Sequence, residues 1–185
     1  MIITITGKPG SGKTTVGKML AEKLGYKFIS MGDIRGRLAQ EHGMTIEQLN
    51  DVGMSEPWTD KEVDDLLKEI LEKEDNLVID SRMAWHFAKK SFNIFLDVDL
   101  RVAAERIFKD QRPDERKHSS VDELLCALEE RVRNDSERYR KWYGVDVCDL
   151  RNYDLVIDTT GKSVSQVLEE VLVALSSNGI IENKA

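Results

Sequence analysis

The sequence of 185 residues predicts an α/β fold built on an open parallel sheet. Short runs rich in Val, Ile, Leu and Phe alternate along the chain with segments of helical periodicity. The runs show little polar alternation, which is typical of strands that are buried on both faces of a sheet. A glycine-rich segment separates the first run from the first helical segment, as in α/β proteins that bind phosphate groups. A ligand is therefore expected outside the carboxyl ends of the strands.

The composition predicts a single soluble domain. Hydrophobic residues make up 41% and charged residues 33% of the chain, which is ordinary for a globular protein. No apolar run is long enough to span a bilayer and no secretory pattern opens the chain, so we expect a cytoplasmic protein without a membrane partner. The net charge of −7 argues against nucleic-acid binding. Cys126 and Cys148 are expected to be free thiols.

The first strand is expected at residues 2–5 and the first helix at residues 16–24. Between them the chain matches G-x-x-x-x-G-K-[ST], the phosphate-binding loop of nucleoside triphosphatases. Its glycines let the main chain approach an anion closely, and successive N–H groups at the helix N-terminus cradle phosphates. Lys13 is expected to reach the β- and γ-phosphates, and the Thr14 hydroxyl to bind Mg²⁺. The residues assigned to the triphosphate are Gly7, Lys8, Pro9, Gly10, Ser11, Gly12, Lys13, Thr14 and Thr15.

Four more strands are expected, at residues 27–30, 76–80, 93–97 and 153–158. Four of the helices are expected to begin with capping boxes, which pair Thr45 with Gln48, Thr59 with Glu62, Ser120 with Glu123, and Ser163 with Gln166. Asp99 is a fifth expected cap. A long helix is expected from residue 121 to about residue 143.

Two stretches exceed the simplest alternation of strands and helices. Residues 31–75 hold three helical segments, with breaks at Gly43 and at residues 53–58, where one crossover helix would suffice. Residues 109–120 are charged and interrupt two helices. Insertions at the carboxyl edge of such a sheet carry substrate domains and lids, so both stretches are expected to serve the ligand site.

Several charged residues admit two interpretations. Asp80 at a strand end could hold Mg²⁺ through water and Arg82 could pair with a substrate phosphate, or the two could be a strand-end acid and a surface arginine. On the long helix, Asp135 falls on the apolar face with Arg131 and Arg138 beside it. This trio is either a salt-bridge ladder worth about 0.2–0.5 kcal/mol per pair or a carboxylate that orients arginines toward a polyanion. Arg106, just before the charged stretch, and Arg112 and Arg116 within it are either solvated or close onto transferring phosphates.

The order of these motifs resembles a known family. The phosphate loop is followed by Ser30-Met-Gly-Asp-Ile34, by Ile79-Asp-Ser-Arg82, and by Arg131-x-x-x-Asp135-x-x-Arg138. A Tyr-Gly-Val-Asp turn then precedes the last strand, within residues 135–158. Together these resemble the nucleoside monophosphate (NMP) kinases, and most closely the short archaeal-type cytidylate kinases, from residue 1 to about residue 175.

The resemblance implies a single kinase domain with the P-loop fold and a five-stranded parallel sheet in the order 2-3-1-4-5. The core would comprise residues 1–30, 76–108 and 121–175, with an NMP-binding insertion at 31–75, a lid at 109–120 and a tail at 176–185. The implied activity is direct transfer of the γ-phosphoryl group of ATP to an NMP, with CMP or dCMP as the expected acceptor. ATP and Mg²⁺ are the implied cofactors, and we expect a monomer.

The resemblance also implies roles for single residues. Lys13, Arg82, Arg131 and Arg112 would be catalytic. The acceptor would be bound by Asp80, Arg82, Arg131, Asp135, Arg138 and one of the two arginines, Arg35 and Arg37, that flank Gly36. Met83 stands where longer bacterial cytidylate kinases place an acid that reads the cytosine edge.

Three alternatives remain at this stage. The first is an adenylate kinase, and the second is a small-metabolite kinase of the shikimate or gluconate type. The third belongs to another class: a nucleotide-driven assembly or RNA-maturation factor with weak ATPase activity and a macromolecular partner. Dependence of ADP release on an added NMP separates the first from the other two.

Overall fold

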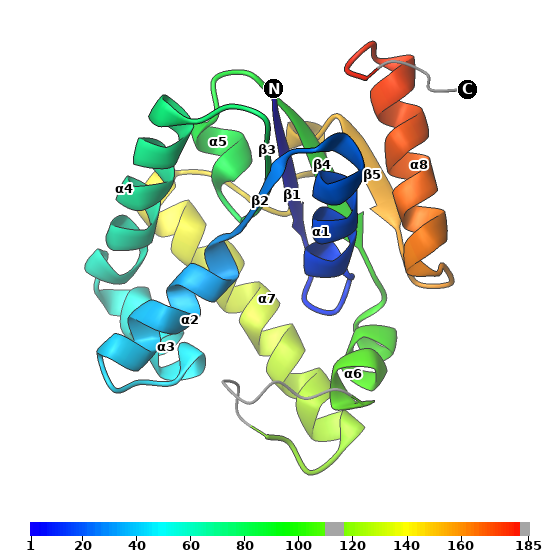
Figure 1. Ribbon diagram of the computed structural model, residues 1–185. Helices are drawn as coiled ribbons and strands as arrows, with labels where there is room; N and C mark the ends of the chain where they lie inside the picture. Colours follow the sequence, from blue (N-terminus) through cyan, green and yellow to red (C-terminus); the bar gives the residue numbers. More distant parts are fainter. Residues whose placement is uncertain (110–116, 182–185) are drawn as a thin grey trace.

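A five-stranded parallel sheet in the order β2-β3-β1-β4-β5 forms the centre of the molecule (Figure 1). In this computed structural model, the structure describes residues 1–109 and 117–181. The strands are β1 (Ile2–Gly7), β2 (Lys27–Ser30), β3 (Leu77–Asp80), β4 (Ser91–Asp97) and β5 (Leu155–Asp158). The α/β fold and the strand order predicted from the sequence are thereby confirmed.

Helices cover both faces of this sheet. They are α1 (Lys13–Leu24), α2 (Met31–Glu41), α3 (Ile46–Ser55), α4 (Trp58–Lys73), α5 (Ala84–Phe87), α6 (Leu100–Lys109), α7 (Val121–Tyr143) and α8 (Val164–Ser177), with a short 3-10 turn at Leu150–Asn152. Helices α1 and α8 lie together on one face, while α4 and α5 lie on the other (Figure 1). Helix α7 runs from beneath α6 toward α4 (Figure 1). No helix in the described ranges combines the length and apolarity needed to cross a membrane.

Side-chain alternation along β3 explains why the sheet needs cover on both faces. Val78 packs with α1 and α8, whereas its neighbours Leu77 and Ile79 pack with α2, α4 and α5. All four residues of the strand are buried. Successive strand residues point to opposite faces, so a strand with two covered faces reads as a continuous apolar run.

Most of the predicted helix caps are confirmed. Thr45 and Ser163 each form the full capping box, and Asp99 Oδ1 accepts from the N–H groups of Arg101 and Val102. The Ser120 hydroxyl accepts from Glu123 N, but the Glu123 carboxylate accepts from Ser119 rather than from the Ser120 N–H. Only half of that box is present.

The predicted cap at Thr59 is wrong. Helix α4 begins at Trp58, one residue after Pro57, whose backbone already has helical angles. Proline fixes φ near the helical value and is tolerated at a helix start. The helix therefore begins before Thr59, whereas a capping box of Thr59 and Glu62 would start it after Thr59. Thr59 lies in the first turn, fully buried, with its hydroxyl 3.4 Å from the carbonyl oxygen of Glu56.

The predicted break at residues 53–58 is shorter in the structure. Helix α3 continues through Gly53 to Ser55. A Cβ at Gly53 would lie 2.8 Å from Thr59 Oγ1 and 3.2 Å from Arg138 Cδ. The glycine therefore permits close packing of α3 against α4 and α7, and does not end the helix.

Candidate functional site

A cavity of about 390 Å³ opens at the carboxyl ends of β1, β2 and β3. The phosphate loop and the start of α1 line one side, and residues of α2, α3 and α4 line another. The β3–α5 turn, α6 and α7 complete it. Ser30 pairs with Asp80 across the β2–β3 ladder, and Ile5 pairs with Asp80 on the other side, so parallel pairing brings these strand ends to one edge. The cavity lies where ligands bind in open α/β sheets.

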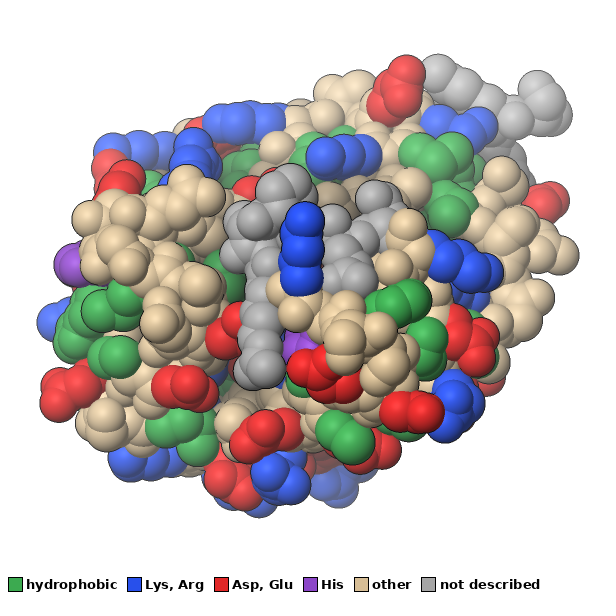
Figure 2. Space-filling view, turned by 90° about the horizontal axis from the view of Figure 1, so that it is seen from below, with side chains coloured by type: hydrophobic (Ala, Val, Ile, Leu, Met, Phe, Trp, Pro, Cys, Tyr) green, Lys and Arg blue, Asp and Glu red, His purple; other side chains and the backbone are tan. Residues whose placement is uncertain are grey.

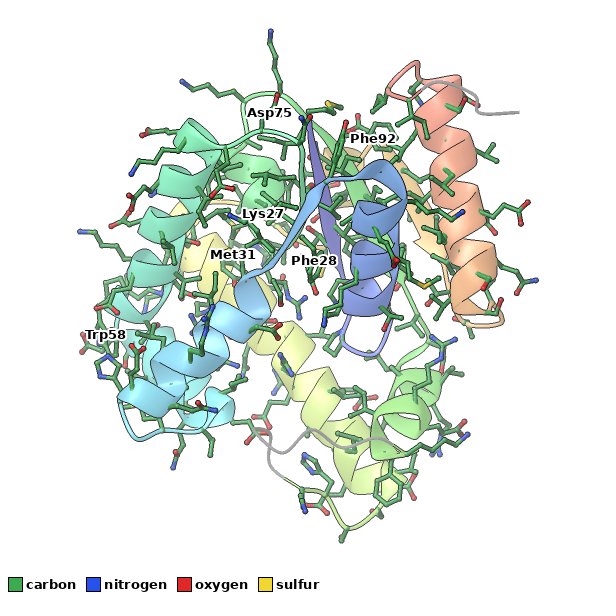
Figure 3. All side chains as sticks on the ribbon, viewed as in Figure 1. Lys27, Phe28, Met31, Trp58, Asp75 and Phe92 are labelled. Carbon is green, nitrogen blue, oxygen red and sulfur yellow. The ribbon has the colours of Figure 1, made fainter. Side chains whose placement is uncertain are left out.

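Figure 3 shows Met31, a lining residue, where β2 leads into α2. Trp58 is labelled at the outer side of the α2–α4 insertion, away from this point (Figure 3). Its ring contacts that of His42 in a tilted arrangement, with ring centroids 4.8 Å apart, and it packs with Ala39, Ile46 and Leu49. Trp58 therefore stabilises the insertion from outside and is not a described lining residue of the cavity.

The phosphate loop has the backbone that its glycines require. Gly7 has a φ of 149° and Gly10 a φ of 72°. A Cβ at Gly7 would lie 2.1 Å from the carbonyl oxygen of Leu96, and one at Gly10 would lie 2.8 Å from Ala103 Cβ. Helix α1 then begins at Lys13 with no side-chain cap from the described residues. Its first N–H groups remain available to an anion, as expected for a phosphate site.

The ammonium group of Lys13 lies across this loop. Its Nζ donates to the Lys8 carbonyl at 2.7 Å. Burial, followed by the positive charge of Arg82, lowers the pKa of Lys13 to about 7, against the opposing effect of Asp80. Both the loss of solvent around Lys13 and the neighbouring guanidinium disfavour its cation. A polyphosphate beside Lys13 would favour the cation again.

Thr14 and Asp80 provide oxygen ligands suitable for a hard cation. The Thr14 hydroxyl donates to Asp80 Oδ2 at 2.6 Å. Within the described ranges, no group of three or more His, Cys, Asp or Glu side chains could hold a metal ion alone. Mg²⁺ is commonly bound by one or two protein oxygens with water and substrate phosphates. This pair fits such a site.

A chain of alternating charges connects the phosphate loop with the insertion. Arg82 donates to the Gly7 carbonyl at 2.8 Å and to Asp135 Oδ2 at 3.1 Å. Arg138 donates to Asp135 Oδ1 at 2.9 Å, and its Nε lies 3.1 Å from Asp60 Oδ2. Asp60 Oδ1 in turn accepts from Arg35 at 2.9 Å. Elements from both ends of the cavity are therefore joined by one buried ion network.

Asp135 is the central acid of this network. Burial alone would raise its pKa, but the guanidinium groups of Arg82, Arg138 and Arg131 overcome that effect and lower the pKa to about 2. The carboxylate is therefore ionised at every physiological pH. Asp135 pairs with Arg138 on its own helix, as in the ladder expected from the sequence, and also with Arg82 from the β3 end, which the ladder does not include.

The network leaves buried hydrogen-bond donors unused. Nη2 of Arg35 and Nη1 of Arg138 have no hydrogen-bond partner among the described residues. The Arg138 side chain is 2% exposed and that of Arg35 is 12% exposed. Buried guanidinium donors without partners are costly, and an anionic ligand would satisfy them.

The structure brings most of the predicted site residues together. The predicted residues among the cavity lining are Pro9, Gly10, Gly12, Lys13, Thr14, Thr15, Arg35, Asp80, Arg82, Arg106, Arg131, Asp135 and Arg138. Gly7 and Lys8 act through their carbonyl oxygens, which hold Arg82 and Lys13. Ser11 donates to the Lys8 carbonyl at 2.8 Å and so supports the loop.

Of the two predicted arginines on α2, only one lines the cavity. Arg37 is exposed on α2 and is absent from the described lining, whereas Arg35 on the same helix points into it. The structure thus favours Arg35 of the two candidates. Arg112 and Arg116 lie outside the described residues.

Among the polar residues of the site that were missed from the sequence are two acids and an amide of the insertion. Asp60 and Asp64 occupy the buried side of α4 together with Val63 and Leu67. Two acids inside an apolar stripe with helical spacing were a signal that could have been found. Asn50 was also missed; its Oδ1 accepts from Arg35 Nε at 2.9 Å.

Charged side chains are mixed on the face drawn in Figure 2. Lys, Arg, Asp and Glu side chains are interspersed there, and the lysines and arginines form no continuous stripe (Figure 2). A broad electropositive surface would be needed for nucleic-acid binding. The described lining of the cavity, by contrast, includes one lysine and several arginines together with aspartates.

Comparison with known proteins identifies the family. A profile of the cytidylate kinase-like family matches residues 2–161. A cytidylate kinase from Methanococcoides burtonii is 35% identical, with 97% of this chain and 99% of the relative covered. One from Methanocella arvoryzae is 39% identical over 91% of this chain and 94% of the relative.

Solved structures with this fold include other phosphotransferases. A shikimate kinase from Bacteroides thetaiotaomicron superposes with a TM-score of 0.67 at 20% identity, over 95% of this chain and 98% of that one. A gluconokinase from Sinorhizobium meliloti 1021 has a TM-score of 0.60 at 17% identity, over 95% of this chain and 91% of that one. At such identities the likeness shows the fold alone. The profile and the relatives show more: the chain belongs to the cytidylate kinase-like family.

Proposed function

We propose that this protein transfers the γ-phosphoryl group of ATP to a nucleoside monophosphate, with CMP or dCMP as the preferred acceptor. The observation that carries the proposal is one cavity lined both by the phosphate loop and by three arginines, the buried Arg138 and the partly buried Arg35 and Arg82. The loop suits a triphosphate donor, and the arginines suit a second phosphorylated ligand. The preference for cytosine rests on the relatives named cytidylate kinase.

Each half of the cavity has its own task in the transfer. Lys13 and the N-terminus of α1 bind the donor phosphates. Mg²⁺ held at Thr14 and Asp80 would neutralise charge on those phosphates. Arg35, Arg82 and Arg138 hold the acceptor phosphate in line, and Arg131 joins them from α7. Phosphoryl transfer needs positioning and charge neutralisation more than covalent catalysis. This set of residues provides the types of group that both tasks require.

The domain division predicted from the sequence forms part of the proposal. Residues 31–75 supply the acceptor side through α2, α3 and α4. Residues 109–120 would close as a lid and exclude water, which otherwise hydrolyses ATP. Arg112 would act from that lid. Residues 176–185 form a tail, and the protein acts as a monomer.

Coupled ADP release with ATP, Mg²⁺ and a panel of nucleoside monophosphates tests the proposal. We expect release to depend on the acceptor and to be fastest with CMP or dCMP. A preference for AMP would indicate an adenylate kinase, and activity with shikimate or gluconate would indicate a small-metabolite kinase. Slow release without any acceptor dependence would favour the assembly or RNA-maturation factor and contradict the proposal.

Arg35 and Arg37 offer a matched pair on one helix. Arg35→Ala removes a buried charge-assisted contact to the acceptor phosphate, and we expect kcat/KM for CMP to fall about 100-fold. The dissociation constant of ATP should be unchanged, because Arg35 lies on the acceptor side. Steady-state kinetics and nucleotide titration measure the two quantities.

Arg37→Ala is the control for this substitution. Arg37 is exposed, so its removal should leave kcat/KM within about two-fold, as for most surface substitutions. Equal losses in the two variants would contradict the assignment of Arg35.

A further inference from the structure

Two acids on α4 face the cavity, and the ion network uses only one of them. Asp60 pairs with Arg35 and Arg138. Asp64 follows one turn later, is 6% exposed and also lines the cavity. Its Oδ2 accepts from the Tyr143 hydroxyl of α7. No described residue donates to its Oδ1. Asp64 is thus held in place by one oxygen while the other remains available to a ligand.

The position of Asp64 relative to the arginines suits the base of a bound nucleotide. Four residues along a helix correspond to about 6 Å, so Asp64 lies one turn beyond the acid that holds Arg35 and Arg138. A base joined through one sugar to a phosphate on those arginines would extend over such a distance. The lining near Asp64 includes Val63, Met83 and Tyr139. Apolar walls with a single polar group are typical of a pocket for a flat ring.

We propose that Asp64 selects the base of the acceptor, with its Oδ1 accepting a hydrogen bond from the exocyclic amino group of cytosine. Uracil has a carbonyl oxygen at that position, which would lie against the carboxylate oxygen with no proton between them. Cytosine N4 is a donor, and an ionised carboxylate only accepts. The inference rests on the proposed function and adds to it the residue that separates CMP from UMP.

The chemistry of this carboxyl group predicts a dependence on pH. Burial raises the pKa of Asp64 to about 6, although the Tyr143 hydroxyl bond opposes the shift. The charge of Asp60 raises it further, whereas Lys68 and Arg35 lower it. Above this pKa the group accepts only. Below it, the protonated oxygen can donate to the uracil carbonyl, so discrimination against UMP should weaken as the pH falls from 8 to 5.5.

Asp64→Asn tests the assignment, with Asp65→Asn as the matched control. Asp65 is the next residue of α4 and is exposed, in a surface pair with Lys68. We expect Asp64→Asn to lower the ratio of kcat/KM for CMP to that for UMP by about 10-fold or more, because a contact that reads one base edge is worth a factor of this size. The Asp65→Asn ratio should equal that of the wild type.

A second measurement uses the unaltered protein. Equilibrium binding of CMP and UMP between pH 5.5 and 8 should show a CMP preference that decreases at the acid end. If the wild type prefers CMP and Asp64→Asn keeps that full preference with a normal melting temperature, the role of Asp64 is overturned. The proposed function then still stands. A wild type that phosphorylates no nucleoside monophosphate would overturn the proposed function as well.

Discussion

Replacement of Lys13 by alanine is expected to reduce the rate of phosphoryl transfer by about 10³-fold or more, because single charge-stabilising groups at transferring phosphates have effects of this size. The Lys13 ammonium lies across the phosphate loop, bonded to the Lys8 carbonyl. No other lysine lines the described cavity. Single-turnover kinetics with ATP and CMP would measure the loss. Retention of more than a tenth of the wild-type rate would contradict the role given to the loop.

The same substitution should raise stability when no nucleotide is bound. The pKa of Lys13 is about 7 in the folded protein, against an ordinary value of 10.5. The unfolded chain therefore binds a proton that the folded protein gives up, and the free energy of unfolding falls as the pH is lowered from about 10.5 to about 7. Lys13→Ala lacks this penalty. Its melting temperature should exceed that of the wild type at pH 7.5, and the difference should narrow toward pH 10.

Lys23→Ala is the control for both effects. Lys23 lies in the last turn of the same helix and is exposed. We expect wild-type rates and a wild-type pH dependence of melting. ATP should raise the melting temperature of this variant as it does that of the wild type, and should do so far less for Lys13→Ala.

The parts of the molecule that were predicted correctly are those with local causes. The phosphate loop depends on glycines at fixed spacing, and the five strands depend on short apolar runs between turn residues. The bounds of helix α7 that its periodicity predicts agree with those in the structure. In each case the signal lies within one element, so neighbouring residues suffice to read it.

The ion network was only partly predictable because its partners are distant in the chain. Asp60 pairs with Arg35 and with Arg138, which lie on other helices. A repeat pattern within one helix cannot reveal such pairs. The choice between Arg35 and Arg37 also required the structure, since it depends on how α2 lies against α4. The cap at Thr59 was misjudged because Pro57 sets the helix start and packing against Gly53 then buries Thr59. Tertiary contacts decided all three.

Replacement of Asp135 by alanine is expected to be the most destabilising single change in the site. It would leave Arg82 and Arg138 buried without the carboxylate that pairs with both. Removal of one partner from a buried ion pair costs about 3–5 kcal/mol. For a domain of this size we expect the melting temperature to fall by about 10 °C. Chemical denaturation at pH 7 would measure the free energy directly.

Asp122→Ala on the same helix provides the comparison. Asp122 pairs with Arg101 on the surface, with side chains 80% and 56% exposed. Such exposed pairs contribute about 0–1 kcal/mol, so this variant should unfold almost as the wild type does. A similar cost for both variants would mean that the burial of the Asp135 network has no energetic consequence.

The pH dependence of the Asp135 variant separates charge pairing from packing. The pKa of Asp135 is about 2 in the folded protein, against an ordinary value of 3.8. This difference stabilises the folded protein by about 2 kcal/mol above pH 4, a contribution that is lost as the pH falls toward 2. The gap in unfolding free energy between the wild type and Asp135→Asn, which is isosteric and neutral, should therefore shrink between pH 4 and pH 2.5. A gap that stays constant over that range would assign the cost to packing and hydrogen-bond geometry, and not to the charge that holds Arg82 and Arg138 at the cavity.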